Sequence, residues 1–192
     1  MTKIAIVTGA SRGFGRGTAR ILASEAGYKV YATARTESAL HSLQKEVAES
    51  NAAGEVIPVV LDQSDDEAVA EFVRRVSASE EKIDLLVNSA YAGLIAMTPH
   101  FGKPFWERPI SVFDGSMDIG VRGAYVMSAL VAPAMVKAKN GLIVQISSYG
   151  GFAYVFDVGY GVAHAAMDRL SFDMATELQD HNVRAVTLHP AG

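Results

Sequence analysis

The sequence predicts an α/β fold built on a doubly wound parallel sheet, and three observations support this prediction. Apolar runs of strand length alternate with segments whose apolar residues recur at helical spacing. A glycine-rich turn joins the first run, which begins at Ile4, to the first helical segment. Because helical segments separate the runs, the strands are expected to pair in parallel with helices on both faces of the sheet. With 192 residues and no repeat, linker or low-complexity segment, the chain is expected to form one domain over residues 1–192.

The predicted elements follow one another regularly up to residue 90 and again from residue 111. Strands are expected from Ile4 to the first glycine and at 29–34, 55–61, 83–87, 142–146 and 183–188. Helices are expected at 16–26, from an N-cap at Thr36 toward Asn51, from an N-cap at Ser64 through Val76, at 111–139 and at 159–180. The segment 91–109 lacks periodicity and is rich in glycine, proline and aromatic residues. We expect it to cross the carboxyl edge of the sheet, where its aromatic side chains either contact a substrate or cover the core.

The composition excludes several classes of function. Hydrophobic residues make up 49% of the chain and charged residues 20%, and the net charge of -4 gives no basic patch suited to nucleic acid. The absence of cysteine rules out disulfides, thiolate catalysis and cysteine-bound zinc, and no metal site is expected. The first residues show no signal-peptide pattern, and no apolar run reaches membrane-spanning length. These features predict a cytoplasmic protein that binds neither nucleic acid nor a membrane.

The glycine-rich turn after the first strand has the spacing Gly9-x-x-x-Gly13-x-Gly15. Free N–H groups at a helix start, helped by the helix dipole, favour an anion, and glycines let a phosphate approach the backbone closely. We therefore expect a nucleotide pyrophosphate at this turn; the alternative is a glycine-rich turn that holds no ligand. The spacing differs from the G-x-G-x-x-G fingerprint, and no Lys-Ser/Thr pair follows, as a P-loop requires.

Two arginines near this turn bear on the identity of the nucleotide. The second strand ends at Arg35, where an NAD-binding fold places a carboxylate on the ribose 2′-hydroxyl. Guanidinium groups match phosphate geometry, so Arg35 and Arg12 are placed to hold a 2′-phosphate between them. This predicts NADP(H) rather than NAD(H), unless both arginines are merely solvated surface charges.

Residues after the later strands supply the remaining groups of the expected site. Asp62 can accept from an adenine amino group, and Asn88 can tie the cofactor to the neighbouring strand. Ser148 follows the fifth strand, while Tyr160 and His164 lie one turn apart on a helix. A tyrosine beside a cation can exchange a proton near neutral pH, and a serine hydroxyl can hold a carbonyl oxygen. The arrangement therefore predicts a hydride-transfer site.

Four motifs together resemble the classical short-chain dehydrogenase/reductase family over essentially the whole chain. They are "TGASRGFG" for T-G-x-x-x-G-x-G, Asp62 for the adenine-contacting aspartate, "NSAYAG" for N-N-A-G, and Ser148 with "YGVAH" for the serine and Y-x-x-x-K. The variants "VNSAYAG", "KPFWERP" and "GVRGAY" resemble the branch called dehydrogenase/reductase family member 1. The resemblance implies a Rossmann-type fold and hydride transfer between the NADPH nicotinamide and a carbonyl or alcohol carbon of a small-molecule substrate.

The same resemblance implies roles for individual residues. Tyr160 would be the general acid/base and Ser148 would polarise the substrate oxygen, with Ser147 as the alternate because the interval between serine and tyrosine varies. The helices 111–139 and 159–180 match those through which family members dimerise, which implies a homodimer. The residues expected to contact NADP(H) are Thr8, Gly9, Ser11, Arg12, Gly13, Phe14, Gly15, Arg35, Asp62, Gln63, Asn88, Ala90, Tyr160, His164 and Pro190.

The sequence departs from the family pattern in three places. His164 stands where the family has its active-site lysine, and histidine is shorter and mostly neutral at pH 7. Asp118 replaces an asparagine that supports a proton path; if it lies close to His164, its carboxylate would restore an imidazolium. The sequence stops at Gly192, without the family's substrate lid, last helix and seventh strand, which predicts an open pocket and an apolar sheet edge. The alternative to a working oxidoreductase is a catalytically silent dinucleotide-binding sensor or subunit.

Overall fold

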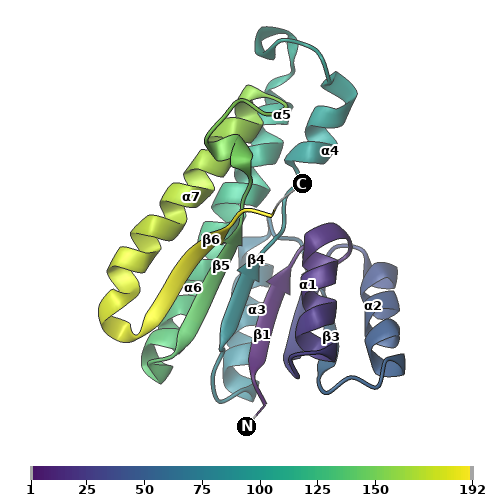
Figure 1. The fold of residues 1–192 in the computed structure, drawn as a ribbon, viewed down its shortest axis with the longest axis vertical. Helices are drawn as coiled ribbons and strands as arrows, with labels where there is room; N and C mark the ends of the chain where they lie inside the picture. The colour runs from purple at the N-terminus through teal and green to yellow at the C-terminus, as the bar shows by residue number, and fades with distance from the viewer. Residues whose placement is uncertain (1, 191–192) are drawn as a thin grey trace.

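The computed structural model describes residues 2–190, which form a six-stranded parallel sheet with helices on both faces (Figure 1). The strands are β1 (Ile4–Thr8), β2 (Lys29–Ala34), β3 (Glu55–Val60), β4 (Leu85–Asn88), β5 (Gly141–Ile146) and β6 (Val183–Leu188). The α-helices are α1 (Gly13–Ser24), α2 (Glu37–Glu49), α3 (Asp66–Ser79), α4 (Gly93–Met97), α5 (Ile110–Ser116), α6 (Ala124–Ala138) and α7 (Val158–Leu178). Shorter helical segments are η1 (Thr98–His100), η2 (Phe105–Glu107), η3 (Met117–Gly123), η4 (Tyr149–Gly151) and η5 (Gln179–His181). The predicted α/β architecture is confirmed.

The strand order β3-β2-β1-β4-β5-β6 determines where a ligand can bind. The chain moves outward from β1 through β2 to β3 and then returns to the other side of β1 at β4. In the register of the sheet, Ile6 of β1 therefore lies between Tyr31 of β2 and Leu86 of β4. In open α/β sheets the connections diverge at such a reversal and leave a crevice beyond the carboxyl ends of the strands.

The core consists of two hydrophobic clusters, one on each face of the sheet. One cluster joins α3 and α6 to the sheet and includes Phe72, Met127 and Ile143. The other joins α1 and α2 to the sheet and includes Val30 and Leu40. Full burial of a side chain of this size stabilises the fold by about 1.5–3 kcal/mol. α4, α5 and the start of α7 project beyond the carboxyl edge of the sheet (Figure 1).

The irregular segment 91–109 contains α4 and two short 3₁₀ turns, η1 and η2. Three of its aromatic side chains, Phe101, Phe105 and Trp106, are 58%, 63% and 71% exposed. The alternative that these side chains cover the core is therefore wrong, because they lie on the surface around the edge of the sheet.

The helix predicted over 111–139 runs continuously from Ile110 to Ala138 as α5, the π-helical η3 and α6. By length and composition this stretch is apolar enough to cross a membrane, contrary to the expectation that no such run exists. In the fold, Met127, Val131 and Met135 of α6 are fully buried in the cluster they share with α3 and the sheet. Core packing thus accounts for part of the apolar character of this span, of which 39% of the apolar window is buried.

Two local predictions need correction. Ser64 does not cap α3: Asp65 is the N-cap, and its Oδ1 accepts from the Ala68 N–H at 3.0 Å. Ser64 instead donates to Asp62, because it lies within the turn that follows β3. α1 begins at Gly13 rather than at residue 16, since the glycine turn leads directly into the helix.

The sixth strand lies at the edge of the sheet, as expected. Among the described residues β6 pairs with β5 alone. Val186 and Leu188 of this strand are exposed.

Candidate active site

A cavity of about 780 Å³ opens at the carboxyl ends of β1, β2, β4 and β5. The glycine turn and Arg35 line it, and so do Ser147, Tyr160 and His164. Twelve of the residues predicted for the site line the cavity: Gly9, Ser11, Arg12, Gly13, Phe14, Gly15, Arg35, Asp62, Gln63, Ala90, Tyr160 and His164. The predicted residues outside the lining are Thr8, Asn88, Asp118, Ser148 and Pro190.

Two glycines give the turn after β1 its shape. Gly9 and Gly13 have φ values of 68° and 55°, in the left-handed region that favours glycine. A Cβ on Gly9 would lie 2.8 Å from the Ala90 Cα, whereas a Cβ on Gly13 would meet no atom within 4 Å. Gly9 therefore permits close packing of the turn, while Gly13 leaves the start of α1 open. The first turn of α1 holds no acidic residue, so its N–H groups and dipole favour an anion there.

Charged side chains surround this opening. Arg12 is the N-cap residue of α1 and Arg35 follows β2, and both are exposed. Arg35 Nη1 lies 3.9 Å from Asp62 Oδ2, while Arg12 forms no ion pair within residues 2–190. Asp62 Oδ1 accepts from the N–H and the hydroxyl of Ser64, at 3.0 and 2.7 Å. These bonds, and then the charge of Arg35, lower the pKa of Asp62 below its usual value, so the carboxylate is ionised at neutral pH.

Thr8 and Asn88 do not line the cavity and instead bond to the elements that form its walls. Thr8 Oγ1 accepts from the N–H groups of Ser89 and Ala90, at 3.0 and 3.1 Å, and thereby ties the end of β1 to the segment after β4. Asn88 is buried, and its Nδ2 donates to Ser128 Oγ at 2.9 Å. Both side chains therefore hold framework elements together.

Tyr160 and His164 share a face of α7 and lie against Ser147, which follows β5. The two rings are 4.2 Å apart at their centroids, and the residues are 8% and 5% exposed. Ser147 Oγ lies 3.2 Å from His164 Nδ1 and donates to the His164 carbonyl oxygen at 3.3 Å. With its proton so engaged, Ser147 accepts from Nδ1–H, which leaves Nε2 as an acceptor. Nε2 is buried and has no hydrogen-bond partner among the described residues.

The expected pairing of Asp118 with His164 is wrong. Burial lowers the pKa of His164 to about 4, and the charges that act on it are those of Asp168, which raises it, and His189, which lowers it. Asp118 is exposed on η3 and acts on Arg122 instead. The physical reason is placement, because Asp118 faces solvent while His164 lies inside the fold. The imidazole is therefore neutral at pH 7.

Ser148 is linked to Tyr160 indirectly, through Gly150. Its Oγ accepts from the Gly150 N–H at 3.2 Å as the N-cap of η4. A Cβ on Gly150 would lie 2.5 Å from Tyr160 Cε1, so this glycine packs directly on the phenol ring. Among the described residues no acceptor engages the Ser148 hydroxyl proton, in contrast to that of Ser147.

Tyr91 lies inside the "NSAYAG" motif but was not among the predicted site residues. Its ring lines the cavity, 5.9 Å from the Tyr160 ring and 5.2 Å from the His164 ring. Its hydroxyl donates to Ser116 Oγ at 3.1 Å. Burial raises the pKa of Tyr91 well above its ordinary value, so this phenol stays protonated and serves as packing against Tyr160.

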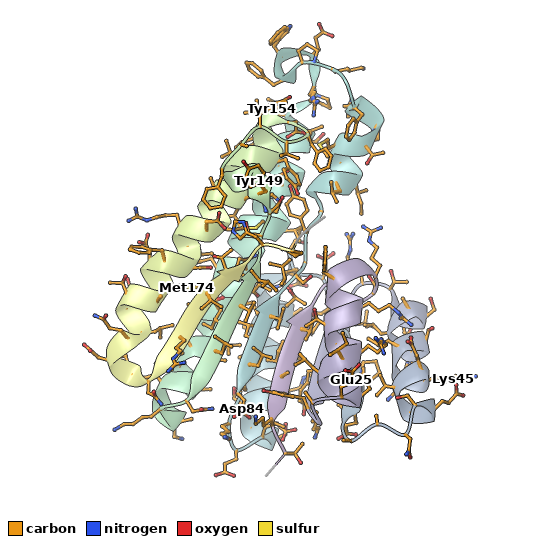
Figure 2. The ribbon with its side chains drawn as sticks, viewed as in Figure 1. Glu25, Lys45, Asp84, Tyr149, Tyr154 and Met174 are labelled. Carbon is orange, nitrogen blue, oxygen red and sulfur yellow. The ribbon has the colours of Figure 1, made fainter. Side chains whose placement is uncertain are left out.

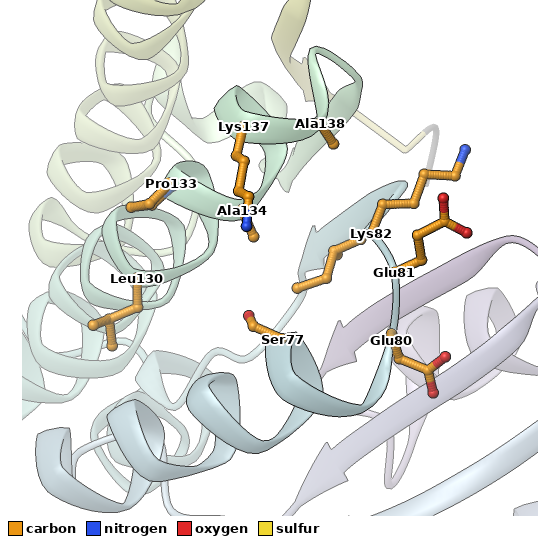
Figure 3. A pocket seen from close by; sticks show the side chains of 10 residues that line it. Ser77, Glu80, Glu81, Lys82, Leu130, Pro133, Ala134, Lys137 and Ala138 are labelled. Atoms are coloured by element: carbon orange, nitrogen blue, oxygen red, sulfur yellow. The ribbon is translucent and has the colours of Figure 1, made fainter.

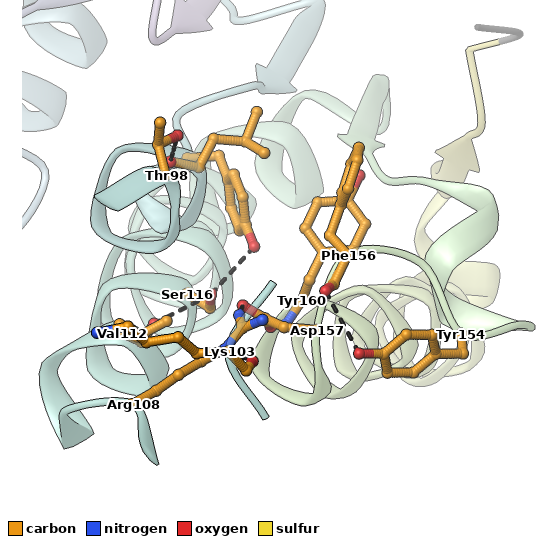
Figure 4. Close-up of polar contacts among 11 residues, drawn as sticks. Thr98, Lys103, Arg108, Val112, Ser116, Tyr154, Phe156, Asp157 and Tyr160 are labelled. Carbon is orange, nitrogen blue, oxygen red and sulfur yellow. Dashed lines mark hydrogen bonds and ion pairs between the residues drawn. The ribbon is translucent and has the colours of Figure 1, made fainter. Parts of the chain in front are cut away.

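A buried ion pair between Arg108 and Asp157 was also missed (Figure 4). Asp157 is the N-cap of α7, and its Oδ1 accepts from the backbone N–H of Tyr160 at 2.6 Å. Directly before it, Phe156 has φ 62°, and the Asp157 N–H donates to the Val155 carbonyl at 2.8 Å. Such a γ-turn at a bulky residue is strained by about 1–3 kcal/mol. Spacing gives no signal for the pair, because its members are 49 residues apart and Arg108 lies in an irregular segment.

Another cavity, of about 530 Å³, lies between the end of α3 and α6 (Figure 3). Its charged lining residues include Glu80, Lys82 and Lys137. Lys82 Nζ pairs with Asp84, just before β4, at 2.8 Å. Figure 2 shows Asp84 at the opposite end of the molecule from Tyr149 and Tyr154. This cavity contains none of the predicted site residues.

The residues present at the larger cavity fit a nicotinamide dinucleotide. The glycine turn offers open backbone at the start of α1, and two arginines stand beside it. His164 lines the same cavity with a buried, unpartnered Nε2 among the described residues, an acceptor suited to a hydroxyl.

Comparison with known proteins agrees with this geometry. The family model for short chain dehydrogenases matches residues 3–192. "Dehydrogenase/reductase SDR family member 1" from Mus musculus is 42% identical over 189 residues, 98% of this chain and 59% of the relative, and the same protein from Homo sapiens matches equally. "Carbonyl reductase (NADPH) 2" from Sus scrofa is 33% identical, over 97% of this chain and 70% of the relative. The chain thus spans 59% of the length of the first two relatives.

Solved structures give the same result. A metagenomic short-chain oxidoreductase in complex with NADP superposes with a TM-score of 0.88 at 32% identity, covering 99% of this chain and 82% of that one. The crystal structure of gox2181 superposes with a TM-score of 0.89 at 25% identity, covering 99% of this chain and 72% of that one. The chain therefore belongs to the short-chain dehydrogenase/reductase family, in the branch of dehydrogenase/reductase family member 1.

Proposed function

We propose that the chain is an NADP(H)-dependent oxidoreductase that interconverts a carbonyl group and an alcohol on a small molecule. One observation carries the proposal: a single cavity joins a glycine turn with two arginines to a buried tyrosine and Ser147. A relative named as an NADPH carbonyl reductase and a solved neighbour in complex with NADP support it.

Tyr160 in the cavity and Ser148 behind its lining divide the reaction between them. A bound nicotinamide supplies the hydride that reaches the carbonyl carbon. Tyr160 donates its phenol proton to the carbonyl oxygen, and in the reverse direction it takes the alcohol proton. Ser148 donates its otherwise unengaged hydroxyl hydrogen to the same oxygen and stabilises the charge that develops there.

Arg35 and Arg12 favour NADP(H) over NAD(H). Both are exposed beside the glycine turn, where a 2′-phosphate can be bound bidentately. The Asp62 carboxylate lies near these arginines, where it accepts from the Ser64 N–H and pairs with Arg35. Its charge is thereby partly compensated at the position where an adenine amino group would donate to it.

His164 favours a second candidate function, a silent dinucleotide-binding protein. A neutral imidazole gives no positive charge beside Tyr160, so nothing at this position assists loss of the phenol proton. Under the leading proposal this absence slows turnover; under the second candidate it abolishes turnover and leaves binding intact.

The test combines NADPH binding, followed by its fluorescence, with NADPH oxidation over a panel of aldehydes and ketones. We expect saturable binding and measurable turnover, and we expect His164→Lys to raise turnover about tenfold or more because it supplies a cation beside Tyr160. Binding without turnover in both proteins selects the silent candidate. No NADPH binding contradicts both candidates.

We further propose that the protein is a cytoplasmic homodimer. Exposed aromatic side chains, Tyr125 on α6 and Phe172 on α7, lie on the two helices expected to pair. Light scattering after size exclusion should give twice the chain mass, and Phe172→Glu should shift the protein toward the monomer. Imaging of a fluorescent fusion of the full-length protein tests the location.

A further inference from the structure

We propose that Arg108 is a positioning residue for Tyr160, acting through Asp157 and the strained turn at Phe156. The inference rests on the proposed function, in which the Tyr160 phenol moves the proton. Arg108 belongs to the segment between α4 and α5, and Asp157 directly precedes α7 (Figure 4). A connection outside the sheet thereby fixes the start of the helix that carries Tyr160.

The Asp157 carboxylate links Arg108 to the backbone of Tyr160. Arg108 Nη1 lies 2.5 Å from Asp157 Oδ2, while Asp157 Oδ1 accepts from the Tyr160 N–H at 2.6 Å. Arg108 Nε also donates to the Lys103 carbonyl at 2.7 Å, so the guanidinium is held on two sides. Displacement of Arg108 would therefore release the group that holds the backbone of Tyr160.

The strained turn at Phe156 directly precedes Asp157 and depends on its surroundings. Phe156 has φ 62°, and a bulky residue keeps such a conformation only where its surroundings impose it. Its ring packs edge-on against Tyr160 at 5.0 Å and against Phe101 at 5.7 Å. Phe101 and Arg108 come from the same segment, which thus holds the turn at two points, through Phe156 and through Asp157.

Burial makes the ion pair sensitive to the loss of either member. The side chains of Arg108 and Asp157 are 6% and 4% exposed. The Asp157 charge also contributes to raising the pKa of the Tyr91 phenol, and among the described residues no second cation pairs with Asp157. Removing one member leaves a buried charge without a partner, which would disturb the fold for reasons unrelated to positioning.

The test therefore removes both charges at once, in the double variant Arg108→Met with Asp157→Asn. The asparagine keeps an oxygen that can accept from the Tyr160 N–H, and the methionine keeps much of the apolar stem. The matched control is Arg169→Met with Asp173→Asn, which removes an exposed ion pair, 2.8 Å long, from the same helix. Each protein is compared with the wild type in thermal stability, NADPH affinity, kcat with the best substrate of the panel, and hydrogen exchange of the Tyr160 amide.

We expect the double variant to bind NADPH within about twofold of the wild type, because Arg108 and Asp157 lie outside the cavity lining. We expect kcat to fall about tenfold or more, since small misplacements of a reacting group are costly. The Tyr160 amide should exchange about tenfold faster, and the control should match the wild type in every measurement. Arg108→Lys, which keeps the charge and loses the bond to the Lys103 carbonyl, should show a smaller loss in the same direction.

Wild-type kcat and wild-type exchange of the Tyr160 amide in the double variant would overturn the proposal, because the pair would then only stabilise the fold. If the double variant does not fold, unchanged kcat and exchange in Arg108→Lys overturn it instead. If the wild type binds NADPH without turnover, the proposed catalytic function fails, and exchange of the Tyr160 amide alone decides the positioning.

Discussion

The two parts of the large cavity are built on different physical principles. The part around the glycine turn presents backbone and exposed charges, with Arg12 and Arg35 beside the start of α1. The part around Tyr160 and His164 is buried, carries a neutral imidazole, and is supported from behind by an ion pair. Substitutions in the first part should therefore change cofactor affinity and leave the fold intact. In the second part, loss of the Tyr160 hydroxyl should change turnover and leave cofactor affinity nearly intact.

The sharpest way to separate the two parts is Tyr160→Phe. Loss of the phenol hydroxyl should lower kcat by about 10²- to 10⁴-fold, the usual contribution of a general acid, while the NADPH Kd stays within about twofold. Tyr149→Phe, at an exposed tyrosine of η4, is the matched control and should leave kcat unchanged. An equal loss of NADPH affinity and of turnover in Tyr160→Phe would mean that the two parts are not separable.

The buried imidazole predicts that part of the stability of the fold depends on pH. The pKa of His164 is about 4 in the fold, against 6.5 when unperturbed, because burial disfavours the charged form. The unfolded chain binds the proton more readily, so this stability is fully present above pH 6.5 and is lost as the pH falls toward 4. The loss amounts to about 3 kcal/mol at most.

Urea unfolding between pH 7 and pH 4 measures this effect. His164→Gln should flatten the curve by a large part of that amount, whereas His41→Gln, at an exposed histidine of α2, should not change it. The charges of Asp168 and His189 also act on His164, so the comparison is made between variants rather than on one curve. Identical curves for the wild type and His164→Gln would show that His164 is not buried in its neutral form.

The smallest expected effect lies in the exposed part. Arg35→Ala should weaken NADPH binding about tenfold, or about 1.4 kcal/mol, and leave NADH binding unchanged, because only NADPH carries the 2′-phosphate. Arg20→Ala, on the same helix as the glycine turn and outside the cavity lining, is the control. Equal weakening of NADPH and NADH binding would mean that Arg35 contacts another part of the cofactor.

The periodicity of the sequence predicts most of the fold, and the residues that directly follow the strands predict most of the cavity lining. The parallel sheet follows from alternation, and the glycine turn, Arg35 and Asp62 follow from their position directly after strands. Local pattern suffices for such groups because topology brings all carboxyl strand ends to one edge of the sheet.

Features that depend on burial or on contacts between distant residues could not be predicted from the sequence pattern. The pairing of Asp118 with His164 failed because exposure, which a motif does not encode, separates the two side chains. The ion pair of Arg108 and Asp157 joins an irregular segment to a helix start, where periodicity carries no information. The resemblance to the family implies a catalytic serine at Ser148 or Ser147. The structure shows that the two serines form different hydrogen bonds.

The central claim, that the cavity is a dinucleotide site selective for NADP(H), is tested most directly by calorimetric titration of the wild-type protein with NADPH and with NADH. We predict one NADPH per chain, bound about tenfold or more tightly than NADH, because two arginines line the cavity beside the glycine turn. Equal affinity for the two cofactors, or no binding of either, would contradict the claim.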